Sequence, residues 1–253
     1  ISVNSIPIWP GSVFFPKALS VSKSKFLLNM VFYVNLSKIS KKKGNILMSK
    51  KEIYLIRHGE TDYNKRGMVQ GSGIDADLNE TGRNQAEAFH TKYGDIQFEK
   101  VYTSALVRTH QTVEKFIKKG IPHEILAELN EISWGEKEGQ EPTTEDNAYY
   151  ANLTKSWSEG NIHLKPTGGE SPVEVADRLK VGLKKIIENS EEKLILIAMH
   201  GRAMRVLLSH ISNLPISDMD TFPHQNTCLY KLEYCYTKGA FEILSRNDVS
   251  HLE

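Results

Sequence analysis

The sequence predicts an α/β fold, a layered domain in which strands alternate with helices. From residue 48 onward, apolar runs of strand length alternate with stretches of helical period. The run 194–199 is apolar at every position, which is typical of a central strand buried on both faces. The chain has no internal repeats and no sign of a second domain.

The expected elements follow this alternation along the chain. Strands are expected at 51–57, 100–103, 123–127, 194–199, 227–236 and 240–246, and helices at 79–92, 104–119, around 145–157, from 172 onward and at 202–211. Asn79 is suited to cap the first helix, Gly120 and Pro122 end the second, and Pro172 occupies the favoured first position of a later one. Residues 237–239 separate the last two strands and predict a closing hairpin.

The charge distribution separates the first 47 residues from the rest of the chain. Of the 32 basic side chains, seven lysines lie in residues 1–47, which contain no acid, so 25 remain against 31 acidic side chains. We expect residues 1–47 to be a non-native or disordered N-terminal extension, with Met48 as the true start and 48–253 as the domain. A mildly acidic body is poorly suited to bind nucleic acid, which requires neutralisation of phosphates.

The cell compartment is inferred from the cysteines and from the apolar runs. Cys228 and Cys235 have no metal-ligand spacing, which favours reduced, structural residues of a cytoplasmic protein. The apolar run 26–34 is too short to span a bilayer and has no cleavage site after it, so no membrane partner is expected. No oligomeric partner is inferred.

Two histidines occupy equivalent positions, each after an apolar strand and before a glycine. They are His58 in Arg57-His58-Gly59 and His200 in His200-Gly201. In open α/β sheets, ligands bind at the carboxyl ends of the strands, so both histidines are expected at one site. Their shared context favours a functional interpretation over surface or core histidines.

Two arginines complete an expected anion site. Arg57 precedes His58, and Arg108 lies near the start of the helix expected after Ser104. A planar guanidinium binds two phosphate oxygens at once, which suits both residues to phosphate recognition. Asn64 is a further candidate. The segment 70–73 resembles a glycine-rich phosphate cradle, so Gln70 and Gly71 are also assigned to phosphate binding, but it lacks the ending of a nucleotide P-loop.

Five motifs in register resemble the histidine phosphatase superfamily, also called the phosphoglycerate mutase-like family. They are Arg57-His58-Gly59-Glu60-Thr61 with Asn64, Ser104 to Arg108, Leu129-Asn130-Glu131, Gly168-Gly169-Glu170-Ser171, and His200-Gly201. The resemblance covers residues 51–252. It implies a three-layer α/β/α sandwich on a mostly parallel, mixed sheet.

The same resemblance implies a phosphohistidine intermediate at His58. Arg57, Arg108, Asn64 and His200 would hold the phosphoryl oxygens, and Glu131 would be the acid. These roles agree with phosphoryl transfer, which requires an in-line nucleophile and neutralised oxygens. Neighbouring guanidinium groups lower the pKa of a histidine and keep it neutral for attack. No cofactor is implied, and no cluster of His, Asp or Glu has metal-ligand spacing.

The expected activity is hydrolysis of a small phosphorylated metabolite by a metal-independent phosphomonoesterase. A phosphoglycerate mutase is the alternative. Hydrolysis is favoured over it, because mutases of this family carry an arginine-rich insert after the acid, whereas segment 132–167 here contains lysines but no arginine. An inactive phosphate-binding scaffold is a third hypothesis. Ser72 and Lys137 stand where the family often has Trp, which leaves the substrate open. Candidates for the pocket wall are Trp134, Tyr149, Tyr150, Trp157, Phe222 and His224.

Overall fold

A single mixed sheet organises the computed structural model, which describes residues 50–253. The expected extension, residues 1–47, lies outside the described residues. The strands are β1 (Lys50–Arg57), β2 (Lys100–Thr103), β3 (His123–Ile125), β4 (Leu194–Met199), β5 (Leu229–Cys235) and β6 (Ala240–Asp248). Their order in the sheet is β3-β2-β4-β1-β5-β6. Strands β3, β2, β4 and β1 are mutually parallel, whereas β5 is antiparallel to both β1 and β6.

Helices connect and cover these strands. They are α2 (Asp62–Lys65), α3 (Glu80–Tyr93), α4 (Val107–Lys118), α5 (Thr144–Ser158), α6 (Pro172–Glu188) and α7 (Gly201–Ile211), with short 3-10 turns η2 (Ala127–Leu129), η3 (Gly135–Lys137) and η4 (Ile216–Thr221). Asn79 caps α3 and Pro172 stands at the start of α6, both as predicted. None of the helices within residues 50–253 is long and apolar enough to cross a membrane.

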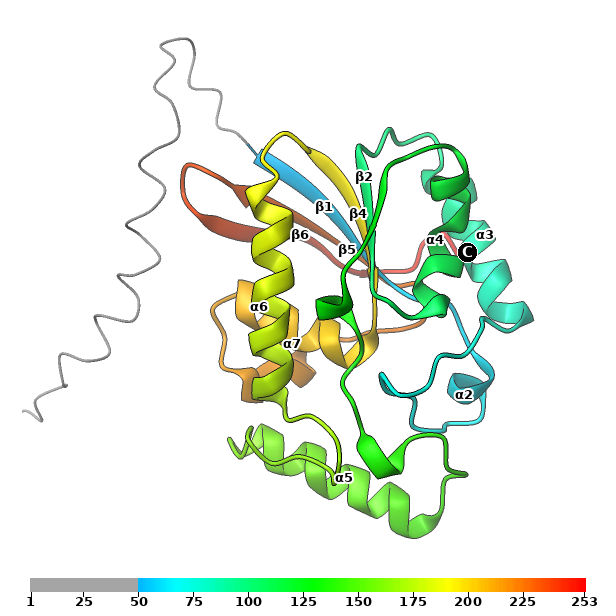
Figure 1. Ribbon diagram of the computed structural model, residues 1–253, viewed down its shortest axis with the longest axis vertical. Coiled ribbons are helices and arrows are strands. Elements are labelled where there is room, and N and C mark those ends of the chain that lie inside the picture. Colours follow the sequence, from blue (N-terminus) through cyan, green and yellow to red (C-terminus); the bar gives the residue numbers. More distant parts are fainter. Residues whose placement is uncertain (1–49) are drawn as a thin grey trace, which may run out of the picture. The chain divides into compact units, whose positions relative to one another are not determined.

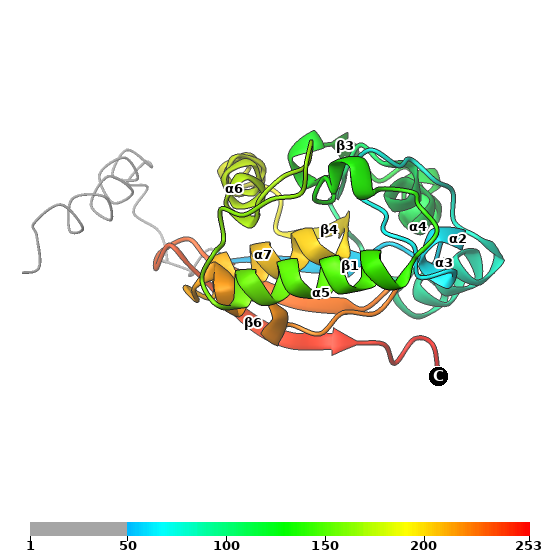
Figure 2. The same ribbon diagram turned by 90° about the horizontal axis from the view of Figure 1, so that it is seen from below.

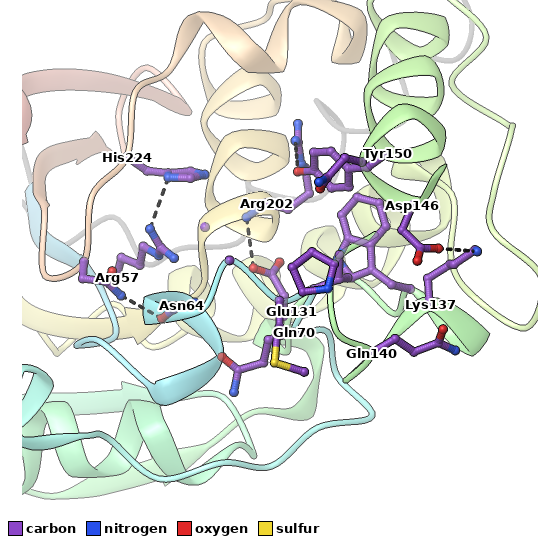
Figure 3. A pocket seen from close by; sticks show the side chains of 18 residues that line it. Arg57, Asn64, Gln70, Glu131, Lys137, Gln140, Asp146, Tyr150, Arg202 and His224 are labelled. Atoms are coloured by element: carbon purple, nitrogen blue, oxygen red, sulfur yellow. Dashed lines mark hydrogen bonds and ion pairs between the residues drawn. The ribbon is translucent and has the colours of Figure 1, made fainter. Parts of the chain in front are cut away.

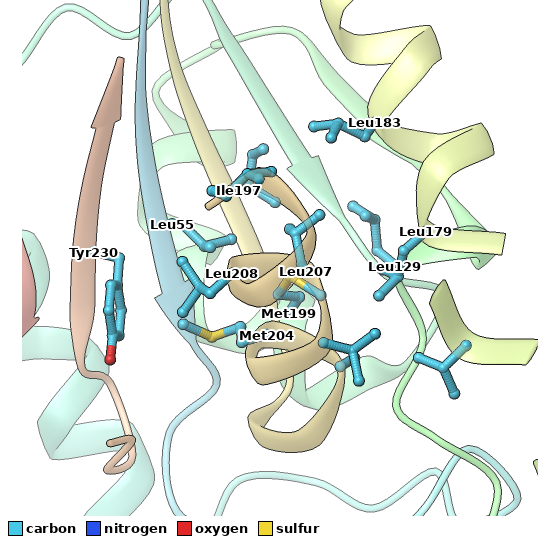
Figure 4. Close-up of a cluster of buried hydrophobic side chains, with 14 of the residues drawn as sticks. Leu55, Leu129, Leu179, Leu183, Ile197, Met199, Met204, Leu207, Leu208 and Tyr230 are labelled. Carbon is cyan, nitrogen blue, oxygen red and sulfur yellow. The ribbon is translucent and has the colours of Figure 1, made fainter. Parts of the chain in front are cut away.

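The sheet has a hydrophobic core on each face, which confirms the predicted three-layer architecture. Along β4, Ile195, Ile197 and Met199 pack with α6 and α7, whereas Leu196 and Ala198 pack with α3 and α4. Successive side chains of a strand point to opposite faces, so a fully apolar strand serves both cores. Figure 1 shows the sheet between these helix pairs, and Figure 4 shows the core that contains α7.

Several predicted boundaries differ from the structure; the strand expected at 123–127, for example, ends at Ile125, because Ala127 begins the turn η2. Two others differ for clear local reasons. Helix α4 begins at Val107 rather than at 104, because Ser104 to Leu106 form a turn in which the Leu106 amide donates to the Ser104 hydroxyl at 3.1 Å. Strand β5 begins at Leu229 rather than at 227, because Thr227 has a left-handed φ of 56° that interrupts the extended chain. The short helix α2 was not predicted. Cys228 and Cys235 are free and buried, as predicted.

The register of the central strands brings the two histidine motifs together. Arg57 at the end of β1 pairs with Met199 at the end of β4, so His58 and His200 leave neighbouring parallel strands side by side. Figure 1 shows α2 and α5 beyond these carboxyl ends, and Figure 2 looks onto them, with α5 crossing in front of β1. The candidate site therefore lies at the carboxyl edge of the sheet, covered by α5.

Candidate active site

The imidazole of His58 is held in one tautomer. Its Nδ1 lies 2.7 Å from the carbonyl oxygen of Gly59, and since a carbonyl only accepts, Nδ1 carries the proton. Nε2 therefore holds the free electron pair. Burial, followed by the charges of Arg108 and Arg57, lowers the pKa of His58 well below its usual 6.5. A neutral imidazole with an available Nε2 is the form that attacks an electrophile.

The loop that carries His58 is packed tightly against two helices. The amide of Gly59 donates to the Thr112 hydroxyl of α4 at 2.9 Å, and the amide of Glu60 donates to Gln85 of α3 at 2.9 Å. A Cβ on Gly59 would lie 2.6 Å from the carbonyl oxygen of Gly82. The glycine after His58 is thus required by this close approach of two backbones.

His200 lies beside His58, with ring centroids 5.1 Å apart, and has the opposite tautomer. Its Nδ1 accepts from the Nε of Arg108 at 3.2 Å, so its Nε2 donates to the Ser104 hydroxyl at 2.8 Å. Burial and then the Arg108 charge lower the pKa of His200 well below 6.5. In this structure His200 is neutral and orients Arg108.

Arg108 is fully buried at the start of α4. Its terminal nitrogens donate to the carbonyl oxygens of Ile74 at 2.7 Å and Gly71 at 3.2 Å. Burial lowers its pKa to about 10, at which the guanidinium is still charged at neutral pH. Gly71, predicted to bind phosphate, does not line the pocket described below; its carbonyl contacts Arg108 instead.

Arg57 is held by a second histidine. One terminal nitrogen donates to Nδ1 of His224 at 3.3 Å, so the proton of that ring sits on Nε2. Burial and then Arg57 lower the pKa of His224 to about 3. A Cβ on Gly201 would lie 3.0 Å from Nε2 of His224, which explains the glycine after His200. Within residues 50–253, neither Arg57 nor Arg108 forms an ion pair.

Two amide side chains face the same space as Arg57. The Oδ1 of Asn64 accepts from Asn226 at 3.1 Å, which leaves its Nδ2 as the donor for a ligand. The Oε1 of Gln70 accepts from the Thr61 hydroxyl at 2.8 Å, and its Nε2 is buried with no partner among the described residues. The Nε of Arg57 is likewise buried and unpartnered. Buried donors without partners are costly, so these two point to a ligand with acceptor oxygens.

The carboxylate of Glu131 lies at the first turn of α7. Oε1 accepts from the amides of Ile132 at 3.0 Å and Ala203 at 2.8 Å, and Oε2 accepts from the amide of Arg202 at 3.1 Å. Oε2 therefore keeps one acceptor position that no residue within 50–253 fills, and Glu131 lines the pocket. This oxygen is the one through which Glu131 can exchange a proton with a ligand.

An arginine on α6 fixes the loop that carries Glu131. Arg178 pairs with both oxygens of Glu170, at 2.8 and 2.9 Å, and donates to the carbonyl oxygens of Glu131 at 3.0 Å and Asn130 at 2.7 Å. These contacts use the planar fork of the guanidinium, which lysine lacks. Glu170 thus orients an arginine rather than facing the reacting groups.

A pocket of about 470 Å³ opens over these groups. Figure 3 shows Arg57, Asn64 and His224 on one side of it and Lys137 with Asp146 on the other. Of the predicted site residues, Arg57, Asn64, Gln70 and Glu131 line the pocket. Three predicted site residues do not line the pocket and are buried next to one another: His58, Arg108 and His200, which are 3%, 0% and 0% exposed.

The pocket wall agrees only partly with the candidates from the sequence. Trp134, Tyr150 and His224 line it, as does Lys137, and Trp134 is also part of the hydrophobic core. Trp157 and Phe222 lie in that core without lining the pocket, and the exposed Tyr149 does not line it either. Several lining residues were missed, among them Arg202 and Asn226. Arg202 directly follows the His200-Gly201 motif, which is a signal that sequence reading could have used; Asn226, in a loop before β5, offers none.

Within residues 50–253, no group of three or more His, Cys, Asp or Glu side chains is placed to hold a metal ion. The cations that line the pocket are Arg57, Lys137 and Arg202, whereas Arg108 is buried beside His200.

The chain is similar to known proteins in sequence and in fold. The family model of the histidine phosphatase superfamily (branch 1) matches residues 53–249. The adenosylcobalamin/alpha-ribazole phosphatase of Salmonella typhimurium is 26% identical over 78% of this chain and 97% of its own. A protein of Proteus mirabilis named as a probable phosphoglycerate mutase is 28% identical, over 79% and 94%. The alpha-ribazole phosphatase of Shigella flexneri superposes with a TM-score of 0.68 at 26% identity, over 78% and 96%.

Proposed function

Because this chain belongs to the histidine phosphatase superfamily, we propose that it hydrolyses a small phosphorylated metabolite through a phosphohistidine on Nε2 of His58. The observation that carries the proposal is the pair of unpartnered donors, Arg57 Nε and Gln70 Nε2, in the pocket beside a neutral histidine. Donors without partners match the oxygens of a phosphoryl group, and the free Nε2 of His58 matches the nucleophile.

The first step transfers the phosphoryl group to the enzyme. The electron pair on Nε2 of His58 attacks phosphorus, and the bond from phosphorus to the ester oxygen breaks. The leaving oxygen takes a proton from Oε2 of Glu131, the oxygen with a free acceptor position. Arg57, Arg108, Asn64 and Gln70 neutralise or hydrogen-bond the equatorial oxygens, whose charge must be stabilised in this type of transfer.

Water completes the reaction in the second step. Glu131 takes a proton from the water, whose oxygen attacks phosphorus, and the bond between phosphorus and Nε2 of His58 breaks. Inorganic phosphate leaves and the neutral imidazole is restored. His200 is proposed to contact the phosphoryl group too. Its Nε2 donates to Ser104 and its Nδ1 accepts from Arg108 in this structure, so Nδ1 donates to a phosphoryl oxygen only after it takes a proton and releases Arg108.

The phosphoglycerate mutase remains the second candidate, and relatives carry both kinds of name. A mutase would return the phosphoryl group to another hydroxyl instead of to water. Segment 132–167 brings Lys137 to the pocket, already paired with Asp146 at 2.7 Å, and no arginine. Hydrolysis is therefore favoured. The cytoplasmic location and the absence of a nucleic-acid partner remain predictions.

The test uses the full chain and p-nitrophenyl phosphate, with 3-phosphoglycerate as a second substrate. We expect release of inorganic phosphate from both, rather than formation of the 2-phospho isomer. After rapid quenching, acid-labile and alkali-stable phosphate should be attached to the protein. His58→Ala should lower turnover by at least about three orders of magnitude, and the exposed His163→Ala is the matched control. Label that persists in His58→Ala would place the nucleophile elsewhere.

A further inference from the structure

Arg202 lies in the pocket wall, apart from the groups assigned to the phosphoryl site. It is the second residue of α7, its side chain is 7% exposed, and it lines the pocket. One terminal nitrogen pairs with Asp220, and the other donates to the Tyr150 hydroxyl at 3.0 Å. Its guanidinium carbon lies 5.7 Å from the centre of a Trp157 ring. The guanidinium is therefore held in place before any ligand binds.

The charge of Arg202 is only partly neutralised. The same oxygen of Asp220 that pairs with Arg202 also lies 2.6 Å from Arg205, so one carboxylate serves two guanidinium groups. Within residues 50–253, neither arginine has a second ion-pair partner. The cluster of Arg202, Arg205 and Asp220, of which Arg202 lines the pocket, thus retains about one positive charge. Lys137, by contrast, pairs with Asp146 at 2.7 Å, and within residues 50–253 Asp146 has no second cation as a partner.

Arg202 also retains hydrogen-bond donors. A guanidinium has five N–H groups, and within residues 50–253 the side chain of Arg202 uses them on Asp220 and Tyr150 only. Its backbone amide contacts Glu131, the proposed acid, at 3.1 Å. The side chain is therefore on the wall next to the position from which the leaving oxygen is protonated. A group on the leaving alcohol would meet it there.

We propose that Arg202 binds a second anionic group, a carboxylate or a phosphate, on the leaving alcohol of the substrate. The substrate is then a phosphomonoester with two acidic groups. This inference rests on the proposed phosphatase function and specifies its substrate class. A rigid guanidinium binds a planar carboxylate or a phosphate with two parallel bonds, and little side-chain entropy is lost on binding. A pocket of about 470 Å³ has room for both groups of a small metabolite.

The experiment compares matched pairs of substrates on the full chain. The carboxylate arm compares 6-phosphogluconate with sorbitol 6-phosphate, and the phosphate arm compares fructose 1,6-bisphosphate with fructose 6-phosphate. We call the ester that carries the second acidic group the diacid, and the diacid ratio is its kcat/KM divided by that of the matched ester without this group. In at least one arm, the diacid ratio should be about ten or more, as expected for a charge-assisted contact with a buried group. The arm with the preference identifies the second group.

The variants assign this preference to Arg202. Arg202→Gln should reduce the diacid ratio to within about twofold of one, mainly through KM, because the contact exists in the bound substrate and the transition state alike. Arg202→Lys should retain part of it. Arg66→Gln is the matched control, since Arg66 forms an exposed ion pair with Glu141 at 2.9 Å and should leave the ratio unchanged.

Asp220→Asn is a second variant at an exposed position, which keeps the test decisive if Arg202→Gln fails to fold. Removal of the shared carboxylate frees both guanidinium charges, so the diacid ratio should rise, an effect that a merely structural role of Arg202 would not produce. Ratios near one in both arms of the wild type, with p-nitrophenyl phosphate still hydrolysed, would overturn this inference and leave the phosphatase function standing. No turnover of any ester would instead overturn the phosphatase function itself.

Discussion

His58 and His200 lie with their ring centroids 5.1 Å apart, and they present opposite nitrogens to their surroundings. His58 donates from Nδ1 to a backbone carbonyl, and His200 accepts at Nδ1 from Arg108. Because the parallel strands β1 and β4 are adjacent and in register, the two histidines that follow them lie at one site. Different partners then give the two rings different chemistry: one has a free Nε2, and the other orients a guanidinium.

Acid should destabilise the protein below about pH 6.5. The pKa values of His58, His200 and His224 are lowered by burial in the folded state. Between the folded pKa and the unfolded value of about 6.5, the unfolded chain binds more protons, so the free energy of unfolding falls as pH falls. Each such histidine contributes a loss of about 1.4 kcal/mol between pH 7.5 and 5.5. Denaturant titrations at the two pH values measure this.

A variant of His224 tests whether the buried histidines cause this loss of stability in acid. His224→Gln preserves an acceptor for Arg57 and removes the titration, so its stability should depend less on pH than that of the wild type. The exposed His163→Gln is the control and should keep the wild-type dependence. Equal pH dependence in the two variants would contradict the prediction.

Glu131→Gln should slow the hydrolysis of esters with poor leaving groups more than that of an aryl phosphate. Proton transfer contributes roughly 10²–10⁴-fold only where the leaving oxygen needs the proton. The ratio of the two turnover rates on the same variant measures this. Equal slowing of both substrates, or of neither, would mean that another group is the acid.

The structure adds a cost to Glu131→Gln that the sequence could not predict. The new amide would place a donor against the backbone N–H of Arg202 or Ala203. A donor that faces a donor costs about 1–3 kcal/mol, so a lower melting temperature is expected as well. Because both substrates are measured on one variant, this loss of stability does not change the ratio.

Gly82→Ala should disrupt the site although alanine is the better helix former. A Cβ at Gly82 would collide with the carbonyl oxygen of Glu60, in the loop that carries His58. Helix propensity favours alanine by about 1 kcal/mol, but overpacking costs about 1–3 kcal/mol and displaces the loop. We expect lower turnover and lower thermal stability than in the exposed Thr81→Ala of the same helix. Matching activity of the two variants would show that the loop tolerates displacement.

Activity should survive exhaustive treatment with a chelator. The positive charge needed at the phosphoryl oxygens is supplied by Arg57 and Arg108, which have no ion-pair partner within residues 50–253. Turnover of p-nitrophenyl phosphate before and after dialysis against EDTA is the measurement. A loss of activity that magnesium or zinc restores would contradict this.

Much of the architecture could be predicted because it depends on local patterns. The apolar run 194–199 specifies a strand buried on both faces, and Ser171-Pro172 specifies a helix start; both occur where expected. The start of α4 was misplaced by three residues, because the turn there is stabilised by the Ser104 side chain rather than by helix propensity. The start of β5 was misplaced because Thr227 adopts a left-handed conformation that its β-branched side chain disfavours.

The sequence by itself determined that His58 and His200 each follow an apolar strand and precede a glycine, since strand endings and their glycines are encoded locally, whereas the pairing of the two strands comes from the tertiary structure. Only the tertiary structure decided which nitrogen of each ring is free, that Trp134 lines the pocket whereas Trp157 lies in the core alone, and that Arg202 shares Asp220 with Arg205. The physical reason is that tautomers and shared charges depend on partners distant in the chain. The pattern of residues in a segment predicts its secondary structure, but it does not predict which distant side chains will contact that segment in the folded protein.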